Sequence, residues 1–344
     1  MRIGVLTGGG DAPGLNAAIR AIVKRCDHYG FEVVGIERGW AGMLEPQTIE
    51  LNYDDIKHIV GKGGTILKTS RTNPLKTPDG MSKVADSFRK LRLDALIAIG
   101  GDDTLGVAKV LSESGLKVVG VPKTIDNDVS ETDATIGFDT AINTAMRIIE
   151  RLRDMAESHE RTVVVEIMGR NAGWIALHSG LAAGADLILI PEEPFKIADV
   201  IDFVKKKMAS KKEPLIIVVA EGAVITDYEG PMTKDTSVDQ FGHVRLGGIG
   251  EFLAKEIREK AKVETRAIAP AHIIRGGPPT AFDRLMATRY GIAAVDLVKE
   301  GKFGLMVALR AGDIVTVPLS EALAKMKTVS KDLYEEARTF FEHC

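Results

Sequence analysis

Short runs of aliphatic and β-branched residues alternate along this chain with longer stretches of helical periodicity. The apolar runs are continuous and do not alternate with polar residues, which is typical of strands buried on both faces of a parallel sheet. We predict strands at residues 3–7, 32–36, 95–99, 118–121, 162–167, 187–190 and 215–220. Helices are predicted between them at residues 16–26, 104–114, 141–156 and 252–260. The alternation favours an α/β fold with right-handed crossovers.

Polar, glycine-rich blocks follow four of the predicted strands. GGGDAPG follows 3–7, GGDDT follows 95–99, PKTIDND follows 118–121 and MGRNAG follows 162–167. Parallel sheets bind ligands at the carboxyl ends of their strands, so we expect the functional residues in these blocks.

The length of 344 residues exceeds the size at which a single core usually stops growing, so we expect two domains, with a boundary near Gly137. Residues 226–250 are polar and glycine-rich, which predicts a long surface excursion. Long excursions of this kind often act as lids or binding loops.

Composition and charge exclude several classes of protein. The net charge of -3 leaves no basic excess for general nucleic-acid binding. No uncharged apolar run approaches the roughly 20 residues that span a bilayer, and the amino terminus does not resemble a secretory signal. Cys26 and Cys344 are the only cysteines, which fits a reducing compartment. We expect a cytoplasmic protein with no nucleic-acid or membrane partner.

The first glycine block, residues 8–14, is suited to a phosphate. Glycines let backbone amides approach an anion, and a helix starting near Pro13 would point its positive end at the same place. The block is not a Walker loop, because no lysine followed by serine or threonine closes it. A tight strand-to-helix turn without a ligand is the alternative.

Two acidic blocks suggest a metal-assisted phosphoryl transfer. Residues 100–104, GGDDT, place two carboxylates after two glycines, and hard oxygen ligands of this kind suit Mg²⁺. Residues 122–128, PKTIDND, place two aspartates two residues apart. Phosphoryl transfer needs a base for the hydroxyl proton and cations that neutralise developing charge. The alternatives are an acidic helix cap at Asp102 or Asp103 and an Asx-rich turn at residues 126–128.

A sugar phosphate requires guanidinium groups for the phosphate and carboxylates or amides for the hydroxyls. Most single arginines are merely solvated surface charges. His272 and Arg275 stand out because the segment APAHIIRGG holds them between proline and glycines. The candidate set is Arg161, Arg170, Glu221, Arg266, His272 and Arg275.

Together, these blocks resemble the phosphofructokinase family. LTGGGDAPGLNAAIR, GGDDT, PKTIDND, IGFDTA, VVEIMGR, ETRA and HIIRGG occur in the order and spacing of that family, from Met1 to about Leu319. The resemblance implies two Rossmann-like α/β domains with mostly parallel sheets and an active site in the cleft between them. It places donor binding in a larger domain, 1–137 plus about 274–324, and fructose 6-phosphate binding in a smaller one, 138–273 plus about 325–344.

The resemblance also implies roles for residues. Asp126 would take the proton from the 1-hydroxyl of fructose 6-phosphate, with Thr124 near the reacting end, and Arg170 would stabilise the transferring phosphoryl group. Asp102 and Asp128 would organise Mg²⁺. The donor-binding residues would be Gly10, Arg71, Gly101, Asp102, Asp103 and Thr104. The sugar-binding residues would be Arg161, Met168, Gly169, Arg170, Glu221, Arg266, His272 and Arg275.

In the family, arginines from two subunits grip the sugar 6-phosphate. The corresponding residues here are Arg161 and Arg266 from one subunit and His272 with Arg275 from the other. The resemblance therefore implies a homodimer or homotetramer with shared active sites. The family's bacterial effector site relies on basic residues near Arg20 and Lys24, one of which is lysine here, so allosteric control is not predicted.

Two positions favour pyrophosphate over ATP as the donor. The common ATP-dependent pattern has glycine where this chain has Asp103 and Lys123. The Asp103 carboxylate would repel an α-phosphate, and Lys123 supplies a compact cation for a short diphosphate. Arg71 is followed by Thr72 and Asn73, without an aromatic for adenine stacking. Lys123, grouped with the catalytic residues, is the stronger signal, because some ATP users also carry an acid at the first position.

Three alternatives remain at this stage. An ATP-dependent phosphofructokinase keeps the same acceptor. NAD kinases and lipid kinases share an element like GGDDT, but they lack counterparts of PKTIDND and HIIRGG. A catalytically silent sugar-phosphate sensor is a different class, because fold does not fix function. The retained Asp102, Asp126, Asp128 and Arg170 do not support it.

Overall fold

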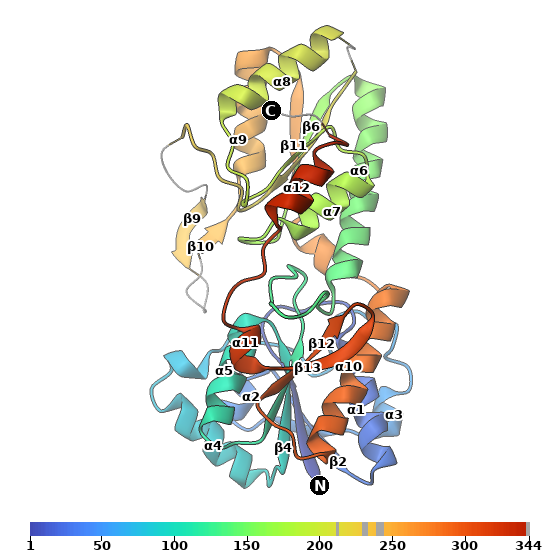
Figure 1. Cartoon of the computed structure of the whole chain (residues 1–344), viewed down its shortest axis with the longest axis vertical. Helices are drawn as coiled ribbons and strands as arrows, with labels where there is room; N and C mark the ends of the chain where they lie inside the picture. Colours follow the sequence, from blue (N-terminus) through green and yellow to red (C-terminus); the bar gives the residue numbers. More distant parts are fainter. Residues whose placement is uncertain (211–212, 229–232, 239–243, 342–344) are drawn as a thin grey trace. The chain divides into compact units, whose positions relative to one another are not determined.

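The computed structural model describes residues 1–210, 213–228, 233–238 and 244–341. These residues divide into two compact units (Figure 1). Unit 1 holds Met1–Thr140 and Arg275–Lys327, and unit 2 holds the described parts of Ala141–Asp239, His243–Ile274 and Thr328–Cys344. The first passage between the units lies inside helix α6 (Phe138–His159).

Unit 1 is built on a seven-stranded sheet of order β13-β12-β5-β4-β1-β2-β3. The strands from β12 to β2 run parallel, and β13 and β3 are antiparallel edges. Their bounds are β1 Arg2–Thr7, β2 Glu32–Ile36, β3 Thr48–Glu50, β4 Ala95–Gly100, β5 Val118–Pro122, β12 Leu305–Arg310 and β13 Asp313–Pro318.

Helices cover both faces of this sheet (Figure 1). They are α1 Leu15–His28, α2 Ala41–Leu44, α3 Tyr53–Ile56, α4 Gly80–Lys90, α5 Asp102–Glu113, α10 Ala281–Lys299 and α11 Leu319–Ala322. Successive strand residues point to opposite faces. Ile97 and Ile99 therefore pack with α1 and α10, whereas Leu96 and Ala98 pack with α4 and α5. Because both faces of β4 are covered, the strand predicted at residues 95–99 is apolar at every position.

Unit 2 is built on a four-stranded parallel sheet of order β11-β6-β8-β7. Its strands are β6 Thr162–Ile167, β7 Leu187–Leu189, β8 Ile216–Ala220 and β11 Thr265–Ile268. Besides α6, its helices are α7 Trp174–Ala182, α8 Ile197–Ser210, α9 Ile249–Glu256 and α12 Lys331–Ala337. Two short helical segments, Ile257–Ala261 and Ala271–Arg275, flank β11.

All seven predicted strands and all four predicted helices are present, with bounds shifted by a few residues at most. The pattern missed β3, β11, β12 and β13 among the strands, and α4, α7, α8 and α10 among the longer helices. The prediction of a simple excursion at 226–250 was incomplete. Its described residues include an antiparallel pair, β9 Thr233–Val238 and β10 Val244–Leu246, and the start of α9, while 229–232 and 239–243 lie outside the described residues.

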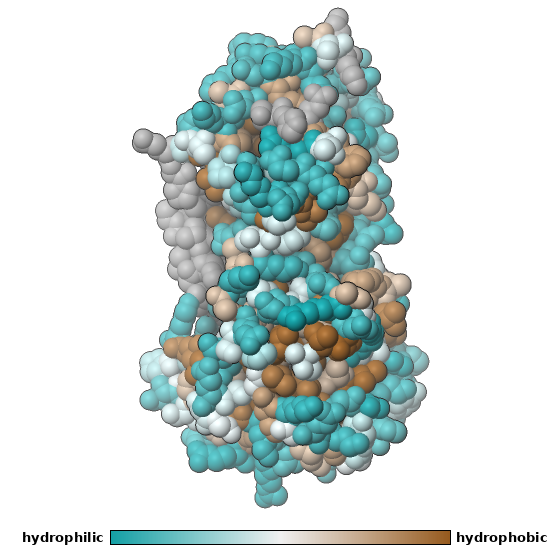
Figure 2. Space-filling view, viewed as in Figure 1, coloured by the Kyte–Doolittle hydropathy of each residue, from teal (hydrophilic) through white to brown (hydrophobic). Residues whose placement is uncertain are grey.

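The visible face of the molecule is mostly hydrophilic, with smaller hydrophobic patches (Figure 2). No helix in the described part of the chain is both long and apolar enough to cross a membrane. Among the exposed apolar side chains, Ile273 is 68% exposed and Leu285 is 66% exposed.

Candidate active site

Three of the predicted blocks meet at one edge of the sheet of unit 1. Strand register places Thr7 beside Ile99 and Ile99 beside Val121. The loops that follow β1, β4 and β5 therefore start side by side. The amide of Lys123 extends the ladder by donating to the carbonyl of Gly100 at 2.9 Å.

The glycine loop, residues 8–11, has every one of its four carbonyls held by a side chain. Lys123 Nζ donates to Gly8 O at 2.9 Å and to Gly10 O at 2.6 Å. Thr69 Oγ1 donates to Gly9 O at 2.6 Å, and Arg275 Nη2 donates to Asp11 O at 2.6 Å. These bonds fix the orientation of the peptide groups that would face an anion.

The amides of the loop are not equivalent. Gly8 N donates to Ile99 O at 2.9 Å and Gly9 N donates to Ser70 O at 3.0 Å. Both amides are therefore engaged within the protein. Among the three glycines, Gly10 is the candidate whose amide would donate a hydrogen bond to a bound phosphate. The bond to Ser70 also brings Arg71, the next residue, alongside the loop.

Glycine is required at positions 8 and 100 because Thr104 packs against both. A Cβ added at Gly8 would lie 2.5 Å from Thr104 Oγ1, and one added at Gly100 would lie 2.3 Å from Thr104 Cβ. Thr104 is 1% exposed. Its side chain therefore fixes the start of α5 against the two loops, whereas donor binding by Thr104 remains a prediction.

Asp102 and Asp103 lie in the first turn of α5, after Gly101 as N-cap. The alternative in which Asp102 or Asp103 is the N-cap does not hold, because α5 starts at Asp102 and its N-cap is Gly101. Carboxylates in a first turn interact favourably with the positive end of the helix. Asp102 is exposed and Asp103 is half-buried.

Lys123 is buried beneath the glycine loop, with 3% of its surface exposed. Burial lowers the pKa of its ammonium to about 7, and the nearby Arg275 acts in the same direction, while Asp11, Asp126 and Asp128 oppose the shift. A cation that titrates near neutral pH thus lies under the proposed donor site.

The loop after β5 holds Thr124 and the two aspartates. Thr124 Oγ1 accepts from the amide of Asp126 at 3.1 Å, and Asp126 is 7% exposed. Asn127 between the aspartates has a left-handed backbone with φ 53. Its Oδ1 accepts from Thr135 N at 3.2 Å, and its Nδ2 donates to Asp133 O at 3.3 Å.

A residue near the end of unit 1 fastens the same loop. Lys327 N donates to Asp128 O at 2.8 Å. Its ammonium donates to the carbonyls of Thr132 and Asp133, both at 2.8 Å. No sequence motif points to Lys327, because its bonds are to main-chain carbonyls and depend on where the chain returns to unit 1.

In unit 2, Met168, Gly169 and Arg170 follow β6. Glu221, which follows the neighbouring strand β8, accepts from Gly169 N at 3.2 Å and from Arg170 N at 3.0 Å through Oε1. Arg170 has a left-handed backbone with φ 53, which non-glycine residues adopt only where surrounding structure enforces it. A Cβ at Gly222 would lie 2.0 Å from Arg170 O, so glycine is needed there for close packing.

Arg161 and Arg266 lie at the other end of the sheet of unit 2. Arg161 precedes β6, and Arg266 is paired in register with Val163 near the start of that strand. Both approach Glu264 Oε1, from Arg161 Nε at 4.0 Å and from Arg266 Nη2 at 3.2 Å. Because a strand rises ~3.3 Å per residue, they lie roughly 20 Å along the sheet from the Met168–Arg170 loop.

His272 and Arg275 share the short helical segment Ala271–Arg275 after β11. His272 is exposed, whereas Arg275 lies against the glycine loop of its own chain. The structure thus gathers Gly10, Arg71, Lys123 and Arg275 at one loop, and it groups Met168, Gly169, Arg170 and Glu221 at another. Sequence reasoning missed the supporting Asp11, Thr69, Asn127 and Lys327.

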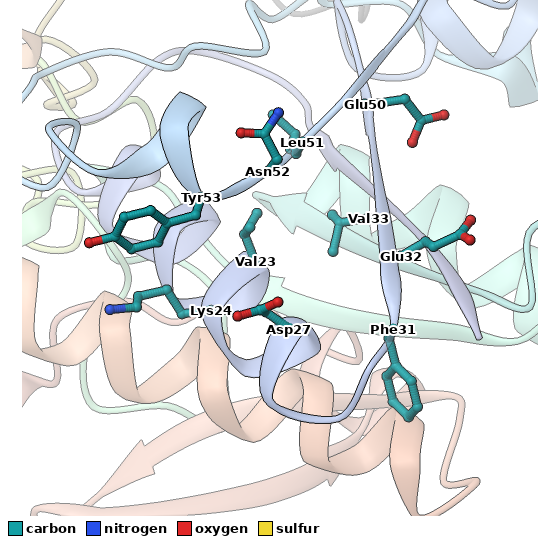
Figure 3. Close-up of a pocket in the computed structure, with 10 residues that line it drawn as sticks. All are labelled: Val23, Lys24, Asp27, Phe31, Glu32, Val33, Glu50, Leu51, Asn52 and Tyr53. Carbon is teal, nitrogen blue, oxygen red and sulfur yellow. The ribbon is translucent and has the colours of Figure 1, made fainter.

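The hollow in Figure 3 contains none of the predicted site residues. It measures about 280 Å³ and lies beside α1, β2 and α3. Lys24 lies over the Tyr53 ring at 5.3 Å from its centre, and Asp27, Glu32 and Glu50 also line the space. Glu32 and Glu50 are paired with Arg2, so the lining has mixed charge and no cluster of cations for a polyphosphate.

Comparison with known proteins is consistent with these features. The family model described as Phosphofructokinase matches residues 2–298. Pyrophosphate--fructose 6-phosphate 1-phosphotransferase of Streptomyces coelicolor is 54% identical over 343 residues, covering 99% of this chain and 100% of that protein. ATP-dependent 6-phosphofructokinase 2 of the same organism is 48% identical over 343 residues, with the same coverage.

A solved phosphofructokinase from Saccharomyces cerevisiae has a TM-score of 0.82 and 29% identity. It matches 94% of this chain, which spans 45% of the yeast chain. The family match covers strands β1 to β5 of unit 1, the four-stranded sheet of unit 2 and the candidate residues from Gly10 to Arg275, and the fold agrees with it. The chain therefore belongs to the phosphofructokinase family.

Proposed function

We propose that the protein transfers a phosphoryl group from pyrophosphate to the 1-hydroxyl of fructose 6-phosphate, giving fructose 1,6-bisphosphate. Two findings support this proposal. The chain belongs to the phosphofructokinase family, and it is 54% identical to the pyrophosphate-dependent relative from Streptomyces coelicolor but 48% identical to the ATP-dependent one. The reaction is a glycolytic step, and a pyrophosphate donor makes it closer to reversible. The cytoplasm is the compartment that this function implies.

Asp126 is the proposed general base. Its carboxyl is nearly buried, and the bond from its amide to Thr124 Oγ1 holds the two residues that would meet the sugar hydroxyl. A positioned base of this kind accelerates phosphoryl transfer by taking the hydroxyl proton as the bond to phosphorus forms. Arg170, held by Glu221, would stabilise the charge on the transferring group.

Asp102 and Asp128 would hold Mg²⁺ together with oxygens of the donor. The described residues contain no group of three or more histidine, cysteine, aspartate or glutamate side chains that could hold a metal by themselves. Two carboxylates completed by substrate phosphates is the set that Mg²⁺ commonly uses. The ion would neutralise charge on the donor oxygens.

The position of Lys123 is the observation that carries the choice of donor. Its ammonium lies under the glycine loop, on the carbonyls of Gly8 and Gly10, where it places positive charge beneath a bound phosphate. Asp103 in the first turn of α5 adds negative charge where a longer nucleotide would continue. A diphosphate is attracted by the ammonium of Lys123, and it lacks the α-phosphate that the carboxylate of Asp103 would repel.

The partner in the assembly would be a second copy of this chain. Arg161 and Arg266 lie at the opposite end of their sheet from Met168–Arg170, so one subunit cannot bring all of them to one sugar phosphate. Phe282 and Leu285, on one side of α10, are 47% and 66% exposed. Exposed apolar residues of this kind are common at interfaces between subunits. A homodimer or homotetramer would cover them and complete each site.

The direct test compares initial rates with pyrophosphate and with ATP, at matched concentrations, with fructose 6-phosphate and Mg²⁺. We expect a preference for pyrophosphate of at least about tenfold, since loss of one charge-assisted contact costs on the order of 1.5–3 kcal/mol. Faster turnover with ATP would overturn the donor and keep the acceptor. Turnover with neither would overturn the proposed reaction.

A further inference from the structure

Asp11 is the residue of the glycine loop to which no step of the proposed reaction gives a role. It lies one position after Gly10, and its side chain is 52% exposed. A carboxylate beside an anion-binding loop repels the donor, so its presence requires a separate explanation. The neighbouring contacts supply one.

Arg275 approaches Asp11 from 264 positions away in the sequence. Nη2 donates to the carbonyl of Asp11 at 2.6 Å, and Nε lies 3.4 Å from its carboxylate Oδ1. The guanidinium also lies directly against Gly10, since a Cβ added there would be 1.9 Å from Nη2. One planar side chain thus contacts both the residue that would bind the donor and the carboxylate that follows it.

The Arg275 contact completes a clamp on the loop. Lys123 holds the carbonyls of Gly8 and Gly10 from the buried side, and Arg275 holds the carbonyl of Asp11. The side chain of Arg275 is 14% exposed, so it has few other positions. A guanidinium carries five N–H donors, and two are used here, which leaves donors for a phosphate.

We propose that Asp11 is a positioning residue that holds Arg275 against the glycine loop, so that this one guanidinium couples sugar-phosphate binding to donor binding. The inference rests on the proposed function, in which Arg275 contacts the 6-phosphate of the sugar. A sugar phosphate bound to the remaining donors of Arg275 immobilises the guanidinium, and the guanidinium in turn fixes Gly10. Each substrate then binds more tightly when the other is present, and the effect is reciprocal.

The test measures binding of methylenediphosphonate, a pyrophosphate analogue that cannot transfer its phosphoryl group, with Mg²⁺ by titration calorimetry. Each protein is titrated with and without saturating fructose 6-phosphate. In the wild-type enzyme we expect the sugar phosphate to lower the Kd of the analogue at least about fivefold. In Asp11→Ala we expect the ratio to fall below about twofold.

General damage to the site and loss of positioning predict different results. Without the sugar, Asp11→Ala should bind the analogue as well as the wild type or better, because a negative charge has been removed from the loop. Damage would weaken binding in both conditions. Asp11→Asn keeps a neutral acceptor and should show an intermediate ratio, and it serves as the second variant if Asp11→Ala does not fold.

Asp86→Ala is the matched control. It removes an aspartate of similar exposure that is paired with Arg89 on α4 of unit 1, away from the glycine loop, and it should keep the wild-type ratio. A wild-type ratio in Asp11→Ala, or no coupling in a wild-type enzyme that turns over pyrophosphate, would overturn the inference alone. Absence of any turnover with pyrophosphate would overturn the proposed donor, and this inference with it.

Discussion

The two candidate loops are fixed by side chains of opposite charge. In unit 1, the glycine loop after β1 has its carbonyls held by Lys123 and Arg275. In unit 2, the loop after β6 has its amides at Gly169 and Arg170 held by the carboxylate of Glu221. In both cases the holding residue, Lys123 or Glu221, comes directly after another strand of the same sheet.

The difference matches what each loop is proposed to bind. Cations on the carbonyls of the glycine loop leave positive charge for a diphosphate. In the second loop a carboxylate holds the amides, and the side chains of Met168, Arg170 and Glu221 are those proposed to meet a hydroxylated sugar. The charge around each strand-end loop is thus set by side chains that reach it from other parts of the fold, Lys123 and Arg275 in unit 1 and Glu221 in unit 2.

The largest effect is expected on kcat, from removal of Asp126, the proposed general base in unit 1. Asp126→Ala should lower kcat at least about 100-fold, the loss typical of removing a general base. Binding of methylenediphosphonate should change little, because the glycine loop and Lys123 remain. Steady-state rates and calorimetry on the same preparation check both statements, and full turnover in this variant would show that the base lies elsewhere.

A smaller loss is expected from removing the cation under the glycine loop. Lys123→Met keeps the length of the side chain but leaves the carbonyls of Gly8 and Gly10 without their donor. We expect the KM for pyrophosphate to rise about tenfold or more, with a smaller change in the KM for fructose 6-phosphate. Equal changes in both constants would contradict the contrast between the loops.

The pH dependence of kcat/KM for pyrophosphate gives a second test of Lys123. Because burial lowers the pKa of Lys123 to about 7, its ammonium is protonated mainly below that pH and is lost as pH rises through it. The wild-type kcat/KM for pyrophosphate should therefore fall as pH rises through about 7. Lys123→Met has no group to titrate there, so this fall should be missing from its profile.

The smallest effect is expected on the sugar side. Glu221→Gln keeps an acceptor for the amides of Gly169 and Arg170 but removes the charge, which weakens the two bonds. The KM for fructose 6-phosphate should rise roughly threefold to tenfold, and the KM for pyrophosphate should stay near that of the wild type. Kinetics with each substrate varied in turn distinguish the two constants, and a selective rise for pyrophosphate would reverse the assignment of the loops.

The sequence by itself determined the α/β class, the central strands and the blocks that follow them. Continuous apolar runs such as 95–99 can be satisfied only where both faces of a strand are covered, so local pattern and burial agree. The edge strands of the seven-stranded sheet and helix α10 were not predicted. β13, DIVTVP, is partly exposed and its pattern is weak, and α10 carries buried residues on much of its circumference, so neither gives a clear periodicity.

Only the tertiary structure decided how the chemistry is supported. The bonds of Lys123, Arg275 and Lys327 go to main-chain carbonyls, which carry no side-chain signature in a sequence. The pairing of Arg275 with Asp11 joins positions 264 residues apart, and strand register alone brings Glu221 to Arg170. Side-chain type fixes which chemistry is available, whereas strand order and chain return fix which groups meet.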